Sequence, residues 1–149
     1  MGYVEELRKL VGTRPLIIVG SAIIVMNEKH QVLLQLRSDT HDWGVPGGAM
    51  EPGETIDETA ARELLEETGL EGESLRFLGV MSGKELYYKY PHGDEIFNVI
   101  HVFQADHVTG VLAVDSEGIE LHYFPIEKLP KLNETTEKIL HKFLGALTE

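Results

Sequence analysis

The stretch that most constrains this chain runs from Gly48 to Leu70, where a glycine-rich segment leads into a predicted helix. Thr55 suits the N-cap, Glu58 can complete a capping box, and Gly69 suits the left-handed turn that ends many helices. Between these caps, three glutamates at i, i+3 and i+4 spacing share one face: Glu63, Glu66 and Glu67. We expect the opposite, apolar face to pack on a core: Ala60, Ala61, Leu64 and Leu65.

Carboxylates at this spacing repel one another by roughly 0.2–0.5 kcal/mol per pair. A hard divalent cation would turn that repulsion into ligation, because Mg²⁺ and Mn²⁺ prefer oxygen ligands. The alternative is a solvated acidic face that binds nothing. The loop before the helix favours the cation, because its glycines allow backbone groups to approach the carboxylates closely: Pro46-Gly47-Gly48 and Glu51-Pro52-Gly53-Glu54.

The complete pattern is longer than the acidic face. Its specified positions are Gly48, Glu54, Arg62-Glu63-Leu64, Glu66-Glu67 and Gly69-Leu70. This pattern resembles the Nudix box and agrees with it at every specified position, over 23 of the 149 residues. The resemblance implies an α+β fold, the Nudix α/β/α sandwich, in which a curved mixed β-sheet lies between helices. We expect residues 1–149 to form one such domain.

The resemblance also implies a chemistry, namely metal-dependent hydrolysis of a pyrophosphate bond in a nucleoside diphosphate linked to another moiety. Nucleotide sugars such as ADP-ribose, dinucleoside polyphosphates and nucleoside triphosphates all qualify. The implied cofactor is Mg²⁺ or Mn²⁺, bound by Glu63, Glu66, Glu67 and the carbonyl of Gly47. Glu54 and Arg62 are implied to hold these ligands in place. Two other classes stay open: a nucleotide-sensing domain without catalysis, and an RNA 5′-pyrophosphohydrolase.

Composition narrows the alternatives. The chain has 42% hydrophobic residues, enough for a core, and a net charge of −12, which argues against an extended nucleic-acid surface. It has no cysteine, which excludes disulfides and thiolate metal sites and fits a cytoplasmic enzyme. No apolar run approaches the ~20 residues that span a membrane.

Hydrophobic periodicity predicts the remaining elements. We expect helices over 3–11 and 134–147, and strands over 16–26, 31–37, 43–46, 75–82, 85–90 and 96–105, with another strand ending at Pro125. The first two strands suggest a hairpin through the turn at 27–30. The N-terminal helix would pack on the domain or on a second subunit, so a homodimer is possible.

Further candidate residues lie outside the box. Arg37 ends a strand, and the resemblance implies that it binds substrate phosphate; the alternative is a surface salt bridge. Tyr88 and Tyr90 share one face of a strand and could stack on a nucleobase, or could serve sheet packing or a dimer contact. The resemblance implies one more metal ligand or a base from the acidic loop, with Glu117 as first choice and Glu120 as second; a solvated loop is the alternative.

Overall fold

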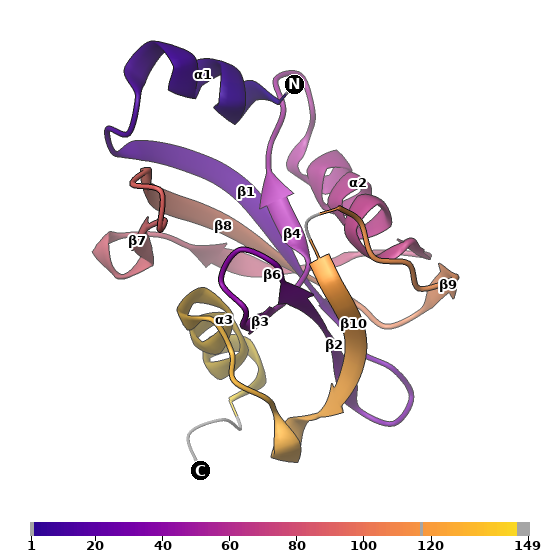
Figure 1. Cartoon of the computed structure of the whole chain (residues 1–149). Coiled ribbons are helices and arrows are strands. Elements are labelled where there is room, and N and C mark those ends of the chain that lie inside the picture. The colour runs from indigo at the N-terminus through magenta and orange to yellow at the C-terminus, as the bar shows by residue number, and fades with distance from the viewer. Residues whose placement is uncertain (1, 117, 146–149) are drawn as a thin grey trace.

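The computed structural model describes residues 2–116 and 118–145 (Figure 1). The elements, in chain order, are α1 (Tyr3–Val11), β1 (Leu16–Val25), β2 (Gln31–Arg37), β3 (Trp43–Gly44), β4 (Gly47–Ala49), α2 (Ile56–Thr68), β5 (Leu70–Gly72), β6 (Arg76–Met81), β7 (Tyr87–Lys89), β8 (Glu95–Ala105), β9 (Val108–Gly110), β10 (Gly118–Pro125) and α3 (Glu134–Leu144). Two short 3₁₀ helices lie at Lys84–Leu86 and Ile126–Lys128.

The central sheet is mixed. Its strands run in the order β4-β1-β8-β6, and β7 also pairs with β8. β1 and β8 are parallel, from the pair Leu16–Ile96 to the pair Val25–Ala105, whereas the other pairs in this sheet are antiparallel. A second sheet has the order β10-β2-β3, and β5 pairs with β9.

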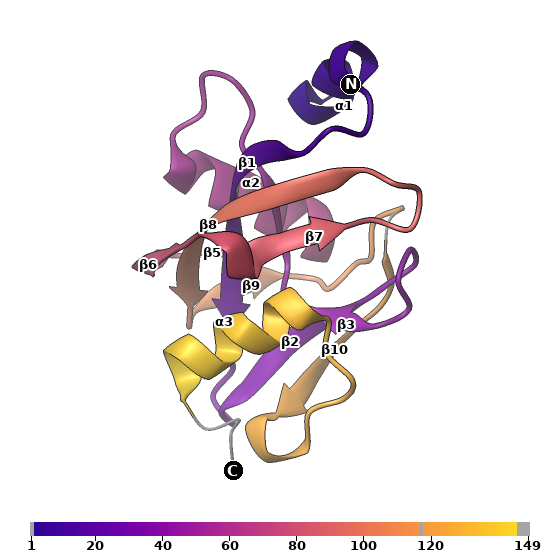
Figure 2. The same ribbon diagram turned by 90° about the vertical axis from the view of Figure 1, so that its left-hand side faces the viewer.

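Helices cover both faces of the sheet, as Figures 1 and 2 show. Strand alternation sends Ile24 and Val102 into a core with Ile139 and Leu140 of α3. It also sends residues of β1 and β8 into a second core with Ala60 and Leu64 of α2: Ile23, Val25, Phe103 and Ala105. This is the predicted three-layer α/β/α sandwich. Among the described helices, none is long and apolar enough to cross a membrane.

The expected hairpin between the first two long strands is wrong. β1 pairs with β4 and β8, whereas β2 pairs with β3 and β10, and a single bridge between Met26 and Val32 joins the two strands. The physical reason is that both strands are buried on both faces, so each lies inside the fold and has long-range partners on its edges.

The ends of two other elements also differ from expectation. The segment expected as a strand over 85–90 begins as a 3₁₀ helix, and only Tyr87–Lys89 pair in the sheet. The last helix ends at Leu144, because Gly145 takes a left-handed conformation with φ of 71°. Leu147, expected in this helix, lies outside the described residues.

The caps of α2 agree with the prediction. The Thr55 hydroxyl accepts a hydrogen bond from the Glu58 amide at 3.1 Å, and the Glu58 carboxylate accepts one from the Thr55 amide at 2.8 Å. Gly69 closes the helix with φ of 79°. The buried face of α2 differs from the predicted one, because Ala61 and Leu65 are exposed. The buried residues of α2 are Thr59, Ala60, Leu64, Glu67 and Thr68.

Candidate active site

The acidic face of α2 opens onto a cleft of about 680 Å³. Its lining contains nine of the predicted site residues: Arg37, Gly47, Glu54, Arg62, Glu63, Glu66, Glu67, Tyr88 and Tyr90. Glu117 lies outside the described residues. Glu120 is exposed on β10 and does not line this cleft. The box and the flanking candidates therefore converge from distant parts of the sequence.

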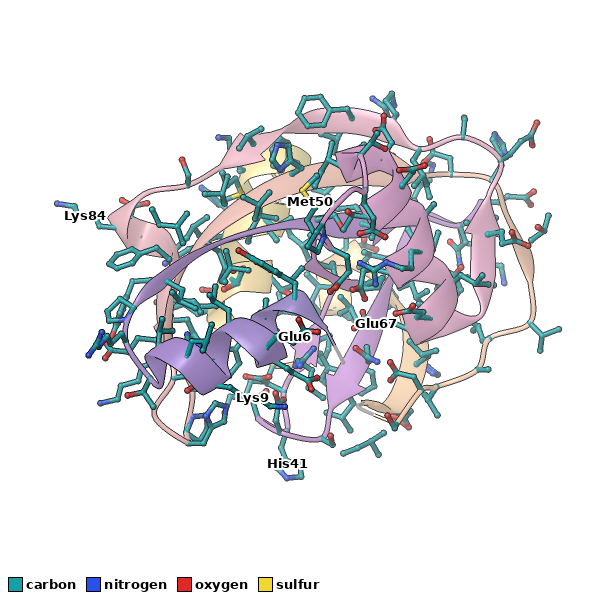
Figure 3. The ribbon with its side chains drawn as sticks, turned by 90° about the horizontal axis from the view of Figure 1, so that it is seen from above. Glu6, Lys9, His41, Met50, Glu67 and Lys84 are labelled. Carbon is teal, nitrogen blue, oxygen red and sulfur yellow. The ribbon has the colours of Figure 1, made fainter. Side chains whose placement is uncertain are left out.

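Glu67, labelled in Figure 3, is the buried member of the acidic face. It is 6% exposed, and its carboxyl group accepts a hydrogen bond from the Gly47 amide at 2.8 Å. Burial raises the pKa of Glu67 to about 8; the hydrogen bond and Arg37 act in the opposite direction, while Glu63 and Asp115 raise the pKa further. A positive charge bound here would stabilise the carboxylate form.

Arg62 links the acidic face to the loop before it. Its guanidinium donates to both carboxyl oxygens of Glu54, at 2.6 and 3.0 Å, and to the Ala49 carbonyl at 3.0 Å. It also pairs with Glu63 at 3.0 Å and with Glu66 at 3.3 Å. These hydrogen bonds from Arg62 lower the pKa of Glu54 to about 2, and they raise the pKa of Arg62. Arg62 and Glu54 therefore hold loop and helix together, as predicted.

The donor set fits a hard divalent cation. Within residues 2–116 and 118–145, no three acidic or histidine side chains already converge as a metal site, since Arg62 holds Glu63 and Glu66 while Glu67 turns to Gly47. The carboxylates nevertheless line one cleft and offer the oxygen ligands that Mg²⁺ and Mn²⁺ prefer.

Gly48 makes room for one of these carboxylates. A Cβ at Gly48 would lie 2.3 Å from Oε2 of Glu63, so any side chain there would displace the carboxylate from the strand. The glycines of β4 therefore bring the backbone against the acidic face, as the sequence indicated.

Arg37 lies in the same cleft with a partner already in place. It binds Asp39 through two hydrogen bonds of 3.1 Å, so the salt bridge considered as an alternative is present.

The aromatic residues of the site form one group. The rings of Tyr88 and Tyr90 are T-shaped with 4.9 Å between their centroids, and the ring of Tyr90 stacks on His92 at 5.4 Å. Tyr88 and Tyr90 thus face the cleft together.

Asp115 is a carboxylate near the site that the sequence analysis missed. It acts on the pKa of Glu67, and its Oδ1 accepts hydrogen bonds from the Gly118 amide at 3.1 Å and from Gln35 Nε2 at 3.4 Å. Gln35 is fully buried on β2 at 1% exposure. The available signal was local: an aspartate three residues before a glycine, which favours a side-chain bond to the backbone.

Comparison with known proteins agrees with this geometry. Residues 17–143 match the NUDIX domain. An ADP-ribose pyrophosphatase from Methanocaldococcus jannaschii is 33% identical over 124 residues, covering 80% of this chain and 69% of that protein. An oxidized purine nucleoside triphosphate hydrolase from Mus musculus is 32% identical over 111 residues, covering 72% and 67%. For a curated relative from Bacillus subtilis, the matched region spans 34% of that relative's length.

The fold agrees as well. The crystal structure of a MutT NUDIX hydrolase from Burkholderia pseudomallei superposes with a TM-score of 0.71 at 25% identity, covering 86% of this chain and 97% of that one. The chain therefore belongs to the Nudix family.

Proposed function

We propose that this chain hydrolyses a pyrophosphate bond in a nucleoside diphosphate linked to another moiety. The observation that carries the proposal is the cleft, in which the acidic face of α2 lies with Arg37 and a pair of tyrosines. The named activities of the two relatives, on ADP-ribose and on oxidized purine nucleoside triphosphates, both fall within this class.

The proposal gives each group a role. Glu63, Glu66, Glu67 and the carbonyl of Gly47 hold Mg²⁺ or Mn²⁺, which when bound supplies Lewis acidity and neutralises charge on the pyrophosphate. Arg37 exchanges Asp39 for a phosphate oxygen of the substrate, because both partners accept the same pair of guanidinium hydrogen bonds. Tyr88 and Tyr90 contact the nucleobase.

The reaction needs one proton acceptor. Water attacks one phosphorus atom, the bridging P–O bond breaks, and two phosphate-bearing products leave. The proton of the water passes to a carboxylate of the site, and the candidates are Glu63, Glu66, Glu67 and Asp115. The role implied for Glu117 stays a prediction, as do the homodimer and the cytoplasmic location.

A substrate panel tests the proposal. Purified protein with Mg²⁺ or Mn²⁺ would be given ADP-ribose, a dinucleoside polyphosphate, oxidized and ordinary nucleoside triphosphates, and 5′-triphosphorylated RNA, with release of nucleoside monophosphate or phosphate as the readout. We expect turnover of at least one small nucleotide. Binding without turnover would overturn the proposal and favour the sensor class, while turnover of RNA alone would favour the third class.

Variants of the acidic face provide the first specific prediction. We expect Glu63→Gln and Glu67→Gln each to lower turnover by about 100-fold or more, because each removes a charged ligand. Glu71→Gln, at the exposed position of β5, is the matched control and should keep full turnover. Turnover near the wild-type value in both ligand variants, with folding intact by circular dichroism, would contradict the assignment.

A further inference from the structure

The N-terminal helix α1 lies outside residues 17–143, the part of the chain that matches the NUDIX domain. It contributes no fully buried residue to either core. It nevertheless forms part of the cleft lining, through Val4 and Glu5, next to its N-cap Gly2. Core packing therefore does not explain the position of α1, whereas the cleft does.

The first turn of α1 is attached to the loop that precedes α2. The amide of Tyr3 donates a hydrogen bond to Oε1 of Glu51 at 3.0 Å. A carboxylate from that loop therefore compensates the partial positive charge at the N-terminus of the helix. The amide of Glu51 in turn donates to Glu54 at 2.9 Å, and Glu54 binds Arg62. Figure 1 shows this loop beside the N-terminal end of α1.

The last turn of α1 is attached to the start of β8 and to the residue before it. The guanidinium of Arg8 donates to the carbonyl oxygens of Gly12 and Glu95, at 2.9 and 2.6 Å, and pairs with Asp94 at 3.6 Å. The Arg8 side chain is only 11% exposed. Hydrogen bonds thus attach the two ends of α1 to two different segments of the domain. We call the part of α1 that lines the cleft, Val4 and Glu5, its wall.

Besides the cleft with the acidic face, α1 lines a second part of the site. Val4 and Glu5 also line an adjoining cavity of about 500 Å³, together with residues from β1, β4, β8 and the segment between β7 and β8. Its lining joins apolar side chains to two amides and several charged groups: Ile18, Ile96, Ile100 and Tyr90, then Asn98 and Asn133, then Arg8, Arg37, Asp39 and Asp94. The apolar part of this lining suits the organic part of a ligand, while Arg37 in the same lining suits its phosphate.

We propose that α1 binds the uncharged part of the nucleotide, with Glu5 as the recognition group and Val4 as an apolar contact. A carboxylate accepts hydrogen bonds and repels phosphate, so the partner of Glu5 is a donor: a sugar hydroxyl or a base amino group. This proposal rests on the proposed function for the identity of the ligand. It makes α1 a specificity element that this chain adds to the family domain.

The test uses two neighbouring glutamates. Glu5 and Glu6 both lie in the first turn of α1, so their removal should affect the helix similarly, but only Glu5 lines the cleft. For the substrate that the panel identifies, we expect Glu5→Ala to raise KM roughly 10-fold or more with little change in kcat, the scale of one lost hydrogen bond to a charged group. Glu6→Ala should match the wild type.

Two further comparisons complete the experiment. Glu5→Gln, which removes the charge but keeps the shape, should fall between wild type and Glu5→Ala, and thermal melting of all variants reports folding. Substrate analogues that lack either the sugar hydroxyls or the base amino group identify the donor, because the analogue without the true donor should lose its sensitivity to Glu5→Ala. Equal KM values for Glu5→Ala and Glu6→Ala would overturn the proposal.

The outcome stays separate from that of the proposed function. If the wild type hydrolyses nothing on the panel, the proposed function fails, and calorimetric binding of ADP-ribose replaces KM. Weaker binding of ADP-ribose by Glu5→Ala than by Glu6→Ala would then still support the proposed role of Glu5 in α1. Equal binding by both variants, or no binding by the wild type, would overturn it.

Discussion

Burial distinguishes Glu67 from its neighbours on α2. Glu67 as a residue is 6% exposed, whereas the Glu66 side chain is 56% exposed. Taking a charge out of water costs free energy unless a partner compensates, and the Gly47 amide compensates only in part. Glu67 is therefore the residue at which a bound cation changes the stability of the protein most.

This burial predicts a pH dependence of the metal-free protein. Because the folded-state pKa of Glu67 is raised to about 8, above the usual value of about 4.3, the folded state binds the proton more tightly than the unfolded state does. The free energy of unfolding should therefore fall as pH rises between these two values. Urea unfolding in the presence of a chelator, from pH 5 to pH 9, measures this fall in the free energy of unfolding.

A neutral residue isolates the contribution of Glu67. We expect Glu67→Gln to flatten the fall in the free energy of unfolding, because glutamine keeps the acceptor for the Gly47 amide but does not titrate. Glu71→Gln should leave the wild-type curve unchanged. A wild-type fall that persists in Glu67→Gln would show that other groups cause it.

Arg62 gives a second prediction at this scale. Arg62→Lys keeps the charge but loses the planar group that binds Glu54, Glu63 and the Ala49 carbonyl together. We expect the free energy of unfolding to fall by about 1–3 kcal/mol, the scale of hydrogen bonds to charged groups. Chemical denaturation measures the fall, and stability equal to wild type would show that these contacts contribute nothing net.

Sequence predicts the residues whose interactions are local. The capping box of Thr55 and Glu58 and the left-handed Gly69 depend on neighbours within a few positions, and they agree with the structure. The exposed Leu65 and the nearness of Asp115 to Glu67 depend on how α2 docks on β1 and on the loop after β9. Helical spacing defines faces, but it does not state how far the helix is rotated against the sheet.

At the scale of elements, the contact between β1 and β4 determines where the acidic face meets the backbone. A Cβ at Gly47 would lie 2.2 Å from the Ser21 carbonyl oxygen, and one at Gly20 would lie 2.5 Å from the Gly48 carbonyl oxygen. These glycines allow the two strands to approach closely. The approach places the Gly47 amide against Glu67.

Gly47→Ala should therefore displace β4. We expect a loss of stability of about 1–3 kcal/mol, as for other overpacked sites, together with a large loss of turnover, because the bond from Gly47 to Glu67 is broken. Gly79→Ala on β6 is the control, since its Cβ would meet only the ring of Phe143, at 3.2 Å. It should keep its turnover; a Gly47→Ala variant with wild-type turnover would contradict the assigned role of β4.

Strand pairing marks the limit of sequence prediction for elements. Apolar runs predicted β1, β2 and β8 to within a residue at each end. Partners were not predictable in the same way, because a strand buried on both faces carries no alternation that selects its neighbours. The short turn after β1 favoured a local hairpin, whereas the structure pairs β1 with distant β8.

The whole molecule carries a net charge of −12, and carboxylates outnumber basic groups in the lining of its cleft. The proposed ligand is nevertheless an anion. Arg37 and Arg62 lie in that cleft, and both are paired with carboxylates. Binding of an anionic nucleotide therefore depends on added positive charge, which connects the metal requirement to the composition of the entire chain. This balance also disfavours long nucleic-acid substrates.

The parallel pairing of β1 with β8 has a consequence for synthesis on the ribosome. The apolar segment Leu16–Val25 emerges early, but its long partner Glu95–Ala105 emerges only after most of the chain has been made. Until then, β1 can pair only with the short β4. Nascent chains stalled before residue 95 should remain sensitive to protease, and chains extended past residue 145 and clear of the exit tunnel should become resistant. The growing protein thus has a long interval in which a chaperone would protect β1 from aggregation.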